Sequence, residues 1–158
     1  MLRISPATPA DVPLLLSFIR KLAEYEKLSH AVVATEASLH DALFSARPAA
    51  EALLAYWNEA PVGFAVFFSN FSTFEGRAGI YLEDLFVDPE MRGKGIGKGL
   101  LREVARIARE RGCPRLEWAV LDWNAPSIAF YRSLGAQPMD DWTVFRMSPE
   151  AIAKLAGS

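Results

Sequence analysis

Hydrophobic residues recur at helical spacing near the start of this chain. Five apolar side chains share one stripe: Leu14, Leu15, Phe18, Leu22 and Tyr25. Thr8 and Asp11, three residues apart, resemble a capping arrangement, so a helix is predicted from there to about Leu28. Similar reasoning predicts three more helices: from the cap Thr35 to about Phe44, Ile96–Arg111 closed by Gly112, and Ala125–Leu134 ended by Gly135.

Shorter apolar segments have the composition typical of β-strands. They are Leu2–Ser5, Ala52–Trp57, Val62–Phe68, Ile80–Val87, Leu116–Leu121 and Thr143–Met147. Asn58-Glu59-Ala60-Pro61 predicts a tight turn between the second and third of these strands. The resulting order of strands and helices predicts an α/β fold with a mixed sheet and helices on its faces, in one domain over residues 1–158.

Composition narrows the possible partners and compartment. The hydrophobic share of 51% suffices for a core, and 17 basic against 19 acidic residues leave a net charge of −2, which favours neither nucleic acid nor an anionic membrane. Leu14–Ile19 lacks the flanking layout of a signal peptide, and Cys113 is the single cysteine, so we expect a cytoplasmic protein without an internal disulfide. His30 and His40 share no metal-ligand spacing with Cys113, and no metal is expected.

The most informative segment is a glycine-rich turn between a predicted strand and a predicted helix. It reads Arg92-Gly93-Lys94-Gly95-Ile96-Gly97-Lys98-Gly99. Glycines let the backbone approach a ligand closely, and the unpaired N–H groups at a helix start suit a phosphate. A dinucleotide fingerprint would need glycine at Lys98 or Leu100, and a P-loop would need Lys-Ser or Lys-Thr after its last glycine, so both alternatives are excluded.

The pattern Arg92-x-x-Gly95-x-Gly97 resembles the pyrophosphate turn that GNAT N-acetyltransferases use for coenzyme A. Two further segments agree with it in order and spacing, Tyr81–Val87 before the turn and Asp122–Tyr131 with Leu134-Gly135-Ala136 after it. Together they resemble the spermidine/spermine (diamine) and thialysine N-acetyltransferase branch of that superfamily, which implies a mixed, mostly antiparallel sheet, acetyl-CoA as cosubstrate and a homodimer.

The resemblance also implies roles for individual residues. The cofactor would contact the backbone of Leu85, Phe86 and Val87, the turn residues Arg92, Gly93, Lys94, Gly95, Ile96, Gly97 and Lys98, and the later residues Trp118, Ala119, Val120, Asn124, Ser127 and Tyr131. Tyr131 matches the family's general acid, Glu83 the base that deprotonates the amine, and the Leu85 N–H the donor to the thioester oxygen. A core tyrosine and an edge carboxylate are the plain alternatives for Tyr131 and Glu83.

The sequence defines the chemical identity of the acceptor less narrowly than that of the cofactor. Tyr25, Glu26, Phe74 and Glu83 match acceptor-site positions, although Phe74 replaces an expected tryptophan. Strict alternation would place Glu83 and Asp84 on opposite faces of their strand. The expected acceptor is the primary amine of a diamine, a polyamine or a thialysine-like amino acid. A protein lysine, a peptide or xenobiotic amine, and a non-catalytic acetyl-CoA sensor stay open as alternatives.

Overall fold

The structure is a computed structural model that describes residues 1–157. It divides the chain into two compact units, one of residues 1–119 and one that begins at Val120.

The first unit contains a five-stranded mixed sheet. Its strands lie in the order β1-β2-β3-β4-β5, antiparallel except for the parallel pair β4 and β5. They are β1 (Leu2–Pro6), β2 (Glu51–Trp57), β3 (Ala60–Ser72), β4 (Arg77–Val87) and β5 (Leu116–Glu117). The predicted α/β fold with a mostly antiparallel sheet is confirmed. The segment predicted as a strand over Leu116–Leu121 pairs only at its first two residues.

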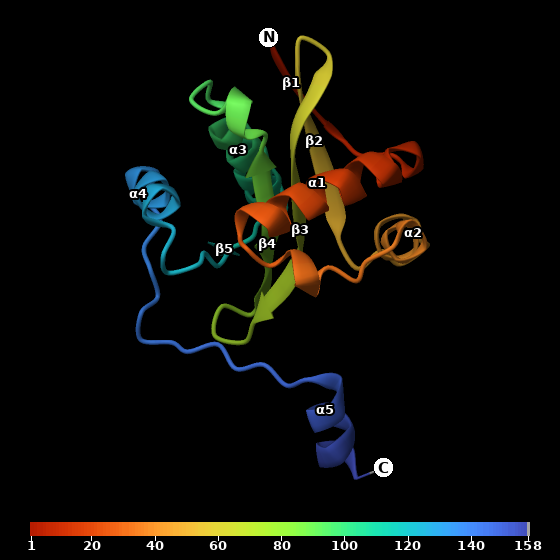
Figure 1. Cartoon of the computed structure of the whole chain (residues 1–158). Helices are drawn as coiled ribbons and strands as arrows, with labels where there is room; N and C mark the ends of the chain where they lie inside the picture. Colours follow the sequence, from red (N-terminus) through yellow and green to blue (C-terminus); the bar gives the residue numbers. More distant parts are fainter. Residues whose placement is uncertain (158) are drawn as a thin grey trace. The chain divides into compact units, whose positions relative to one another are not determined.

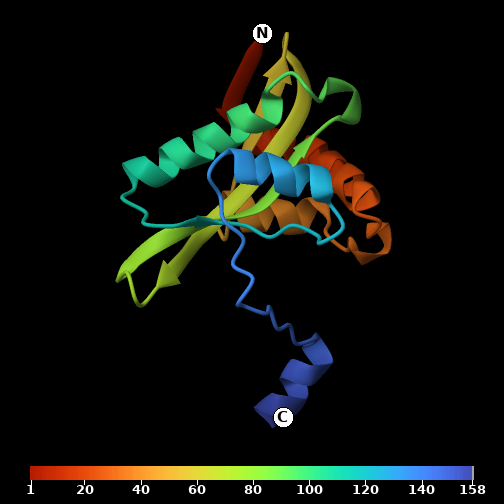
Figure 2. The ribbon, with the colours of Figure 1, turned by 90° about the vertical axis from the view of Figure 1, so that its left-hand side faces the viewer.

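Helices cover both faces of this sheet (Figure 1, Figure 2). Helix α1 (Val12–Tyr25) and α2 (Glu36–Phe44) lie on one face, and α3 (Ile96–Glu110) lies on the other. Three short 3-10 turns accompany them: η1 (Pro9–Asp11), η2 (Ser29–Ala31) and η3 (Pro89–Met91). The predicted cap of α2 is confirmed, because the Thr35 hydroxyl accepts a hydrogen bond from the Ser38 N–H at 3.1 Å.

The core between α1 and the sheet is aromatic. Phe18 of α1 stacks on Phe64 of β3 with ring centroids 5.7 Å apart, and Phe86 of β4 lies 6.2 Å from Phe18. All three side chains are buried. Burial of such rings stabilises the fold by about 2–3 kcal/mol each, so this cluster fixes the end of β4 against α1.

A β-bulge interrupts β4 at Glu83. Asp84 pairs with Val66, but the next pair is Leu82 with Phe67, so Glu83 is an extra residue without a partner on β3. Cross-strand partners share a face, so the bulge reverses the alternation of β4. Strict alternation, which would have put Glu83 and Asp84 on opposite faces, is therefore wrong at this point.

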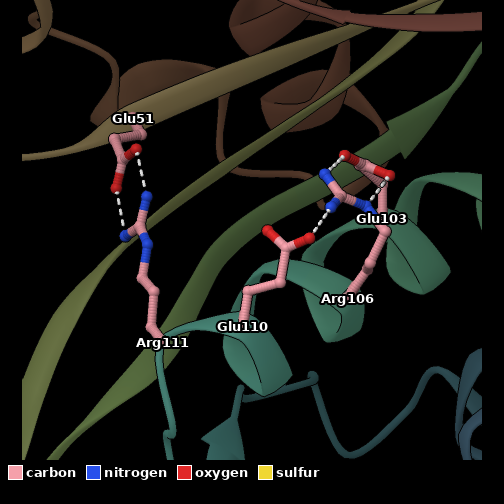
Figure 3. A network of polar contacts seen from close by, with 5 residues as sticks. All are labelled: Glu51, Glu103, Arg106, Glu110 and Arg111. Carbon is pink, nitrogen blue, oxygen red and sulfur yellow. Dashed lines mark hydrogen bonds and ion pairs between the residues drawn. The ribbon is translucent and has the colours of Figure 1, made fainter.

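An ion-pair network ties α3 to the sheet (Figure 3). Arg111, the residue after α3, donates to both carboxylate oxygens of Glu51 at the start of β2, at 2.7 and 2.8 Å. Arg106 bridges Glu103 and Glu110 along the exposed side of the same helix. The first pair joins residues 60 positions apart, whereas the second supports the helix locally.

The second unit holds two helices, α4 (Ala125–Ser133) and α5 (Pro149–Ala156). The α4 prediction is confirmed within one residue, and α5, capped by the Ser148 hydroxyl, had no prediction. The predicted strand Thr143–Met147 is wrong: this segment is irregular. Its β-branched and aromatic residues suit a strand, but a strand needs a partner for its backbone groups, and no strand pairs with it among the described residues.

Candidate active site

The glycine turn adopts the geometry that its sequence predicts. Gly93 and Gly95 have φ angles of +83° and +79°, which residues with a Cβ rarely adopt, and Gly95 is the residue from which α3 starts. The first N–H groups of α3 have no acceptor inside the helix. Together with the helix dipole, they make the start of α3 suited to an anionic group such as a pyrophosphate.

Gly97 and Gly99 differ in whether the packing of the protein leaves room for a side chain. A Cβ at Gly99 would lie 2.7 Å from the Leu2 Cδ2, so this glycine lets α3 pack closely on β1. A Cβ at Gly97 would meet only the Val87 Cγ2, at an ordinary 3.7 Å. The fold itself therefore does not require glycine at position 97, and this fits a backbone that a ligand approaches closely.

The side chain of Arg92 lies back across the end of α1. Its Nε donates to the Val87 carbonyl at 3.2 Å, and its guanidinium carbon lies 4.6 Å from the ring centroid of Tyr25 and 5.9 Å from that of Phe86. Lys94 of the same turn lies 5.6 Å from the ring centroid of Trp57. The cationic residues of the turn are thus held over aromatic rings.

The strand that leads into the turn, β4, offers a ligand mainly its main-chain groups. Phe86 is buried in the aromatic core, so only its main chain is offered to a ligand. Val87 faces α3, as its approach to Gly97 shows, and Leu85 shares that face by alternation. Pairing of β4 with β5 covers Ile80–Leu116 and Tyr81–Glu117, and β4 then continues to Val87 beyond this pairing.

Three carboxylates interact where α1 ends beside β4. Burial, followed by the charges of Glu83 and Glu26, raises the pKa of Asp84 to about 7. Burial, followed by the charge of Glu83, also raises the pKa of Glu26. The structure therefore brings Glu26 and Glu83 together as expected and adds Asp84 to them. Such a group favours a cation beside it.

The remaining predicted site residues lie in the turn between β3 and β4, after β5 or in the second unit. Phe74 lies in the turn between β3 and β4 with 96% of its surface exposed, and Trp118 and Ala119 follow β5. Val120, Asn124, Ser127 and Tyr131 belong to the second unit. There, the buried Asn124 side chain accepts from the Ser127 N–H at 3.3 Å and so caps α4, and the Tyr131 ring lies 5.5 Å from that of Phe130.

The described residues offer neither a metal-binding cluster nor a membrane-spanning helix. Residues 1–157 contain no group of three histidine, cysteine, aspartate or glutamate side chains placed to hold a metal ion. No helix within the same residues has the length and apolar character needed to cross a bilayer.

The fold and the glycine turn are those of an acyl-CoA-dependent transferase, and comparisons with known proteins agree. Residues 19–136 match the family described as the acetyltransferase (GNAT) family. A thialysine N-epsilon-acetyltransferase from Bos taurus is 41% identical, over 98% of this chain and 96% of that protein. The L-ornithine N5-acetyltransferase NATA1 of Arabidopsis thaliana is 32% identical, over 97% of this chain and 87% of that protein.

A solved structure shares the fold of this chain. An integron cassette protein from the mobile metagenome of V. cholerae superposes with a TM-score of 0.80 at 29% identity, covering 99% of this chain and 98% of that chain. The chain belongs to the GNAT acetyltransferase family and is an acetyltransferase. The family implies acetyl-CoA as cosubstrate, and the turn Arg92–Lys98 fits it by the backbone geometry described above.

Proposed function

We propose that this enzyme transfers the acetyl group of acetyl-CoA directly to the primary amine of a small cationic acceptor. The observation that carries the proposal is a group of three interacting carboxylates. Glu26 directly follows α1, and Glu83 and Asp84 belong to β4, the strand that leads into the cofactor turn. A cationic amine would relieve the mutual repulsion of these charges. An apolar or anionic acceptor would gain nothing from them.

Within this class, the relatives favour an amino acid over a plain polyamine. The two relatives reported above are named for thialysine and for L-ornithine, which both carry a side-chain amine. A thialysine-like amino acid is therefore the first acceptor to test, followed by diamines and polyamines.

The proposed residue roles follow from what the chemistry requires. Acetyl-CoA supplies an acetyl group activated as a thioester. Glu83 takes a proton from the ammonium, through water, because only the free amine has the lone pair that forms the new C–N bond. The Leu85 N–H donates to the carbonyl oxygen as it gains charge. Tyr131 gives its proton to the sulfur when the C–S bond breaks, and its neutral phenol is restored from solvent.

The remaining cofactor contacts are proposed from the resemblance. Trp118, Ala119 and Val120 would line the pantetheine arm opposite β4, and Asn124 and Ser127 would lie near it at the start of α4. No metal takes part in this scheme. The cytoplasmic location is likewise a proposal, resting on the single cysteine Cys113.

We also propose that the chain forms a homodimer through the segment around Phe145. Trp142, Val144 and Phe145 are 77%, 85% and 92% exposed, although large apolar side chains grouped in this way usually pack against a partner. The family resemblance implies pairing through C-terminal strands. A partner strand from a second copy would give Thr143–Met147 the backbone partners that it lacks within its own unit.

Release of free coenzyme A tests the proposed function. The enzyme is incubated with acetyl-CoA and, separately, thialysine, L-ornithine, lysine, putrescine, spermidine and a lysine peptide, with Tyr131→Phe as the inactive control. Turnover of one small amine, lost in the variant, is expected. Turnover of the peptide alone would indicate a protein acceptor, and tight acetyl-CoA binding without any turnover would indicate a sensor.

A further inference from the structure

One face of α1 reaches the cofactor turn through two charged contacts. Lys21 and Tyr25 are four residues apart and so lie on the same side of this helix. The Lys21 ammonium pairs with the Asp88 carboxylate at 3.1 Å, and the Tyr25 ring lies under the Arg92 guanidinium at 4.6 Å. Asp88 and Arg92 flank η3, the segment that joins β4 to the glycine turn.

The Asp88 carboxylate is the more constrained end of the first contact. Asp88 is only 8% exposed, and its N–H donates to the Val62 carbonyl of β3 at 2.8 Å, so the residue is fixed at the end of the sheet. The Lys21 ammonium, in contrast, is half exposed and crosses the buried Phe18 ring at 5.5 Å. A buried carboxylate paired with one ammonium depends on that partner.

The second contact fixes the other end of the segment. Arg92 uses its Nε for the Val87 carbonyl and its guanidinium face for Tyr25 and Phe86. Its side chain therefore folds the chain around η3 back onto the end of β4. Gly93 and Gly95, which follow at positive φ, have little conformational restraint of their own, so the position of Arg92 determines where the N–H groups of the turn begin.

From this arrangement we propose that Lys21 and Tyr25 are positioning residues for the cofactor. They hold η3 and Arg92 in place, and thereby preorganise the glycine turn for the pyrophosphate of acetyl-CoA before any acceptor binds. This inference rests on the proposed function for its ligand. It gives Tyr25 a role in cofactor binding, whereas the family resemblance places that residue beside the acceptor.

Acetyl-CoA binding without acceptor, measured by calorimetry, separates these roles. Tyr25→Leu removes the ring and Lys21→Met removes the ion pair, and each is expected to weaken the affinity about three- to tenfold. Tyr25→Phe and Lys21→Arg keep the contact and should stay within about twofold of the parent. Arg20→Met is the matched control, because Arg20 is an exposed cation one residue earlier with no ion pair within residues 1–157.

Steady-state kinetics on the same variants provide a second readout. The KM for acetyl-CoA should rise in Tyr25→Leu and Lys21→Met, and in Lys21→Met, which carries no acceptor role, kcat should stay within about twofold of the parent. If Tyr25→Leu unfolds, the double variant Lys21→Met/Asp88→Asn replaces it: restored affinity relative to Lys21→Met alone supports the pair.

Three results would overturn the inference. Unchanged acetyl-CoA affinity in both Tyr25→Leu and Lys21→Met would leave Tyr25 with an acceptor role only. An equal loss of acetyl-CoA affinity in Arg20→Met would mean that the overall charge of the helix, and not these two contacts, causes the effect. Failure of the parent itself to bind acetyl-CoA would be a different outcome, because it would remove the proposed function together with this inference.

Discussion

Arg111 and Glu51 face each other through two parallel hydrogen bonds of 2.7 and 2.8 Å, which join the end of α3 to the start of β2. The Arg111 guanidinium also lies 6.0 Å from the Phe67 ring centroid on the sheet face that α3 covers. The flat guanidinium suits both contacts, since it can pair edge-on with a carboxylate and lie over a ring. An ammonium can also lie over a ring, but it cannot form the two parallel hydrogen bonds.

For this pair, Arg111→Lys should lower the free energy of unfolding by about 0.5–1 kcal/mol, because both side chains are 43% exposed and solvent screens them. Urea denaturation at low and high salt measures the effect. Salt should reduce the difference between the parent and Glu51→Gln. A double-mutant cycle with no coupling between positions 51 and 111 would contradict the prediction.

Gly97→Ala should affect folding and ligand binding in opposite directions. The Cβ has room in the protein, and alanine favours a helix over glycine, so the free energy of unfolding should rise by up to about 1 kcal/mol. Acetyl-CoA affinity should fall about tenfold or more, because the added methyl group hinders close approach to the backbone at the start of α3. Thermal unfolding and calorimetry measure the two effects.

Gly99→Ala serves as the matched control for that variant. Its Cβ would press on the Leu2 Cδ2, which is the end of a side chain that can shift. The free energy of unfolding should therefore change, while the affinity for acetyl-CoA should stay within about twofold of the parent. Equal losses of affinity at both positions would show that any methyl group on this turn of α3 disturbs the site.

Asp84→Asn should stabilise the protein at high pH. Burial first, and then the charges of Glu83 and Glu26, raise the pKa of Asp84 from its ordinary 3.8 to about 7 in the folded state. The folded protein therefore keeps a proton that the unfolded chain releases between about pH 4 and 7, and stability falls as the pH rises through this range. The asparagine variant avoids this loss, with a gain of about 1–3 kcal/mol above pH 7.

Denaturation at pH 4.5, 6 and 8 measures this prediction. The advantage of Asp84→Asn should be much smaller at pH 4.5 than at pH 8, because the folded carboxyl group is then protonated and the pH is close to the ordinary pKa of 3.8 of the unfolded chain. A constant advantage at all three pH values would mean that the Asp84 charge is not its source. The same variant should raise the KM for a cationic acceptor.

Glu83→Gln should lower kcat by about 100-fold or more, because the ammonium loses its proton acceptor. The deficit should narrow toward pH 10, where solvent removes that proton without help. Acetyl-CoA affinity should not change. The exposed Glu24→Gln on α1 is the control, and an equal pH profile for parent and Glu83→Gln would exclude Glu83 as the base.

Phe145→Ser should shift the proposed homodimer to monomers, seen by sedimentation velocity at micromolar concentration. The Phe145 side chain is 92% exposed in the single chain, so the stability of the isolated monomer should not fall. A dimer as tight as that of the parent would place the interface elsewhere.

The sequence was informative where local chemistry decides the structure. The positive φ angles of Gly93 and Gly95 and the Thr35 cap follow from residue type, so both could be predicted. The interruption of an apolar strand by Glu83 and Asp84 signalled a special position, but not the extra residue that reverses the strand. That reversal depends on the register with β3, which no local pattern encodes.

Contacts between distant segments escaped prediction for the same reason. Lys21 and Asp88 are 67 positions apart, and neither residue stands out in its own segment. Thr143–Met147 shows the opposite failure, since its residue types favour a strand but strand formation depends on a partner. The placement of Arg92 over Tyr25 could not be foreseen either, because it requires the end of α1 to meet the end of β4.

The bulge at Glu83 divides β4 into two segments whose side chains alternate in opposite phase. Before it, even-numbered side chains such as Leu82 turn toward the α3 face, and after it even-numbered side chains such as Phe86 turn toward α1. Deleting this one residue would give β4 a single alternation and exchange the α1-facing and α3-facing side chains along half the strand. A protein engineer can therefore redesign residues 77–82 while the segment Leu85–Val87 keeps its orientation, provided that the extra residue is retained.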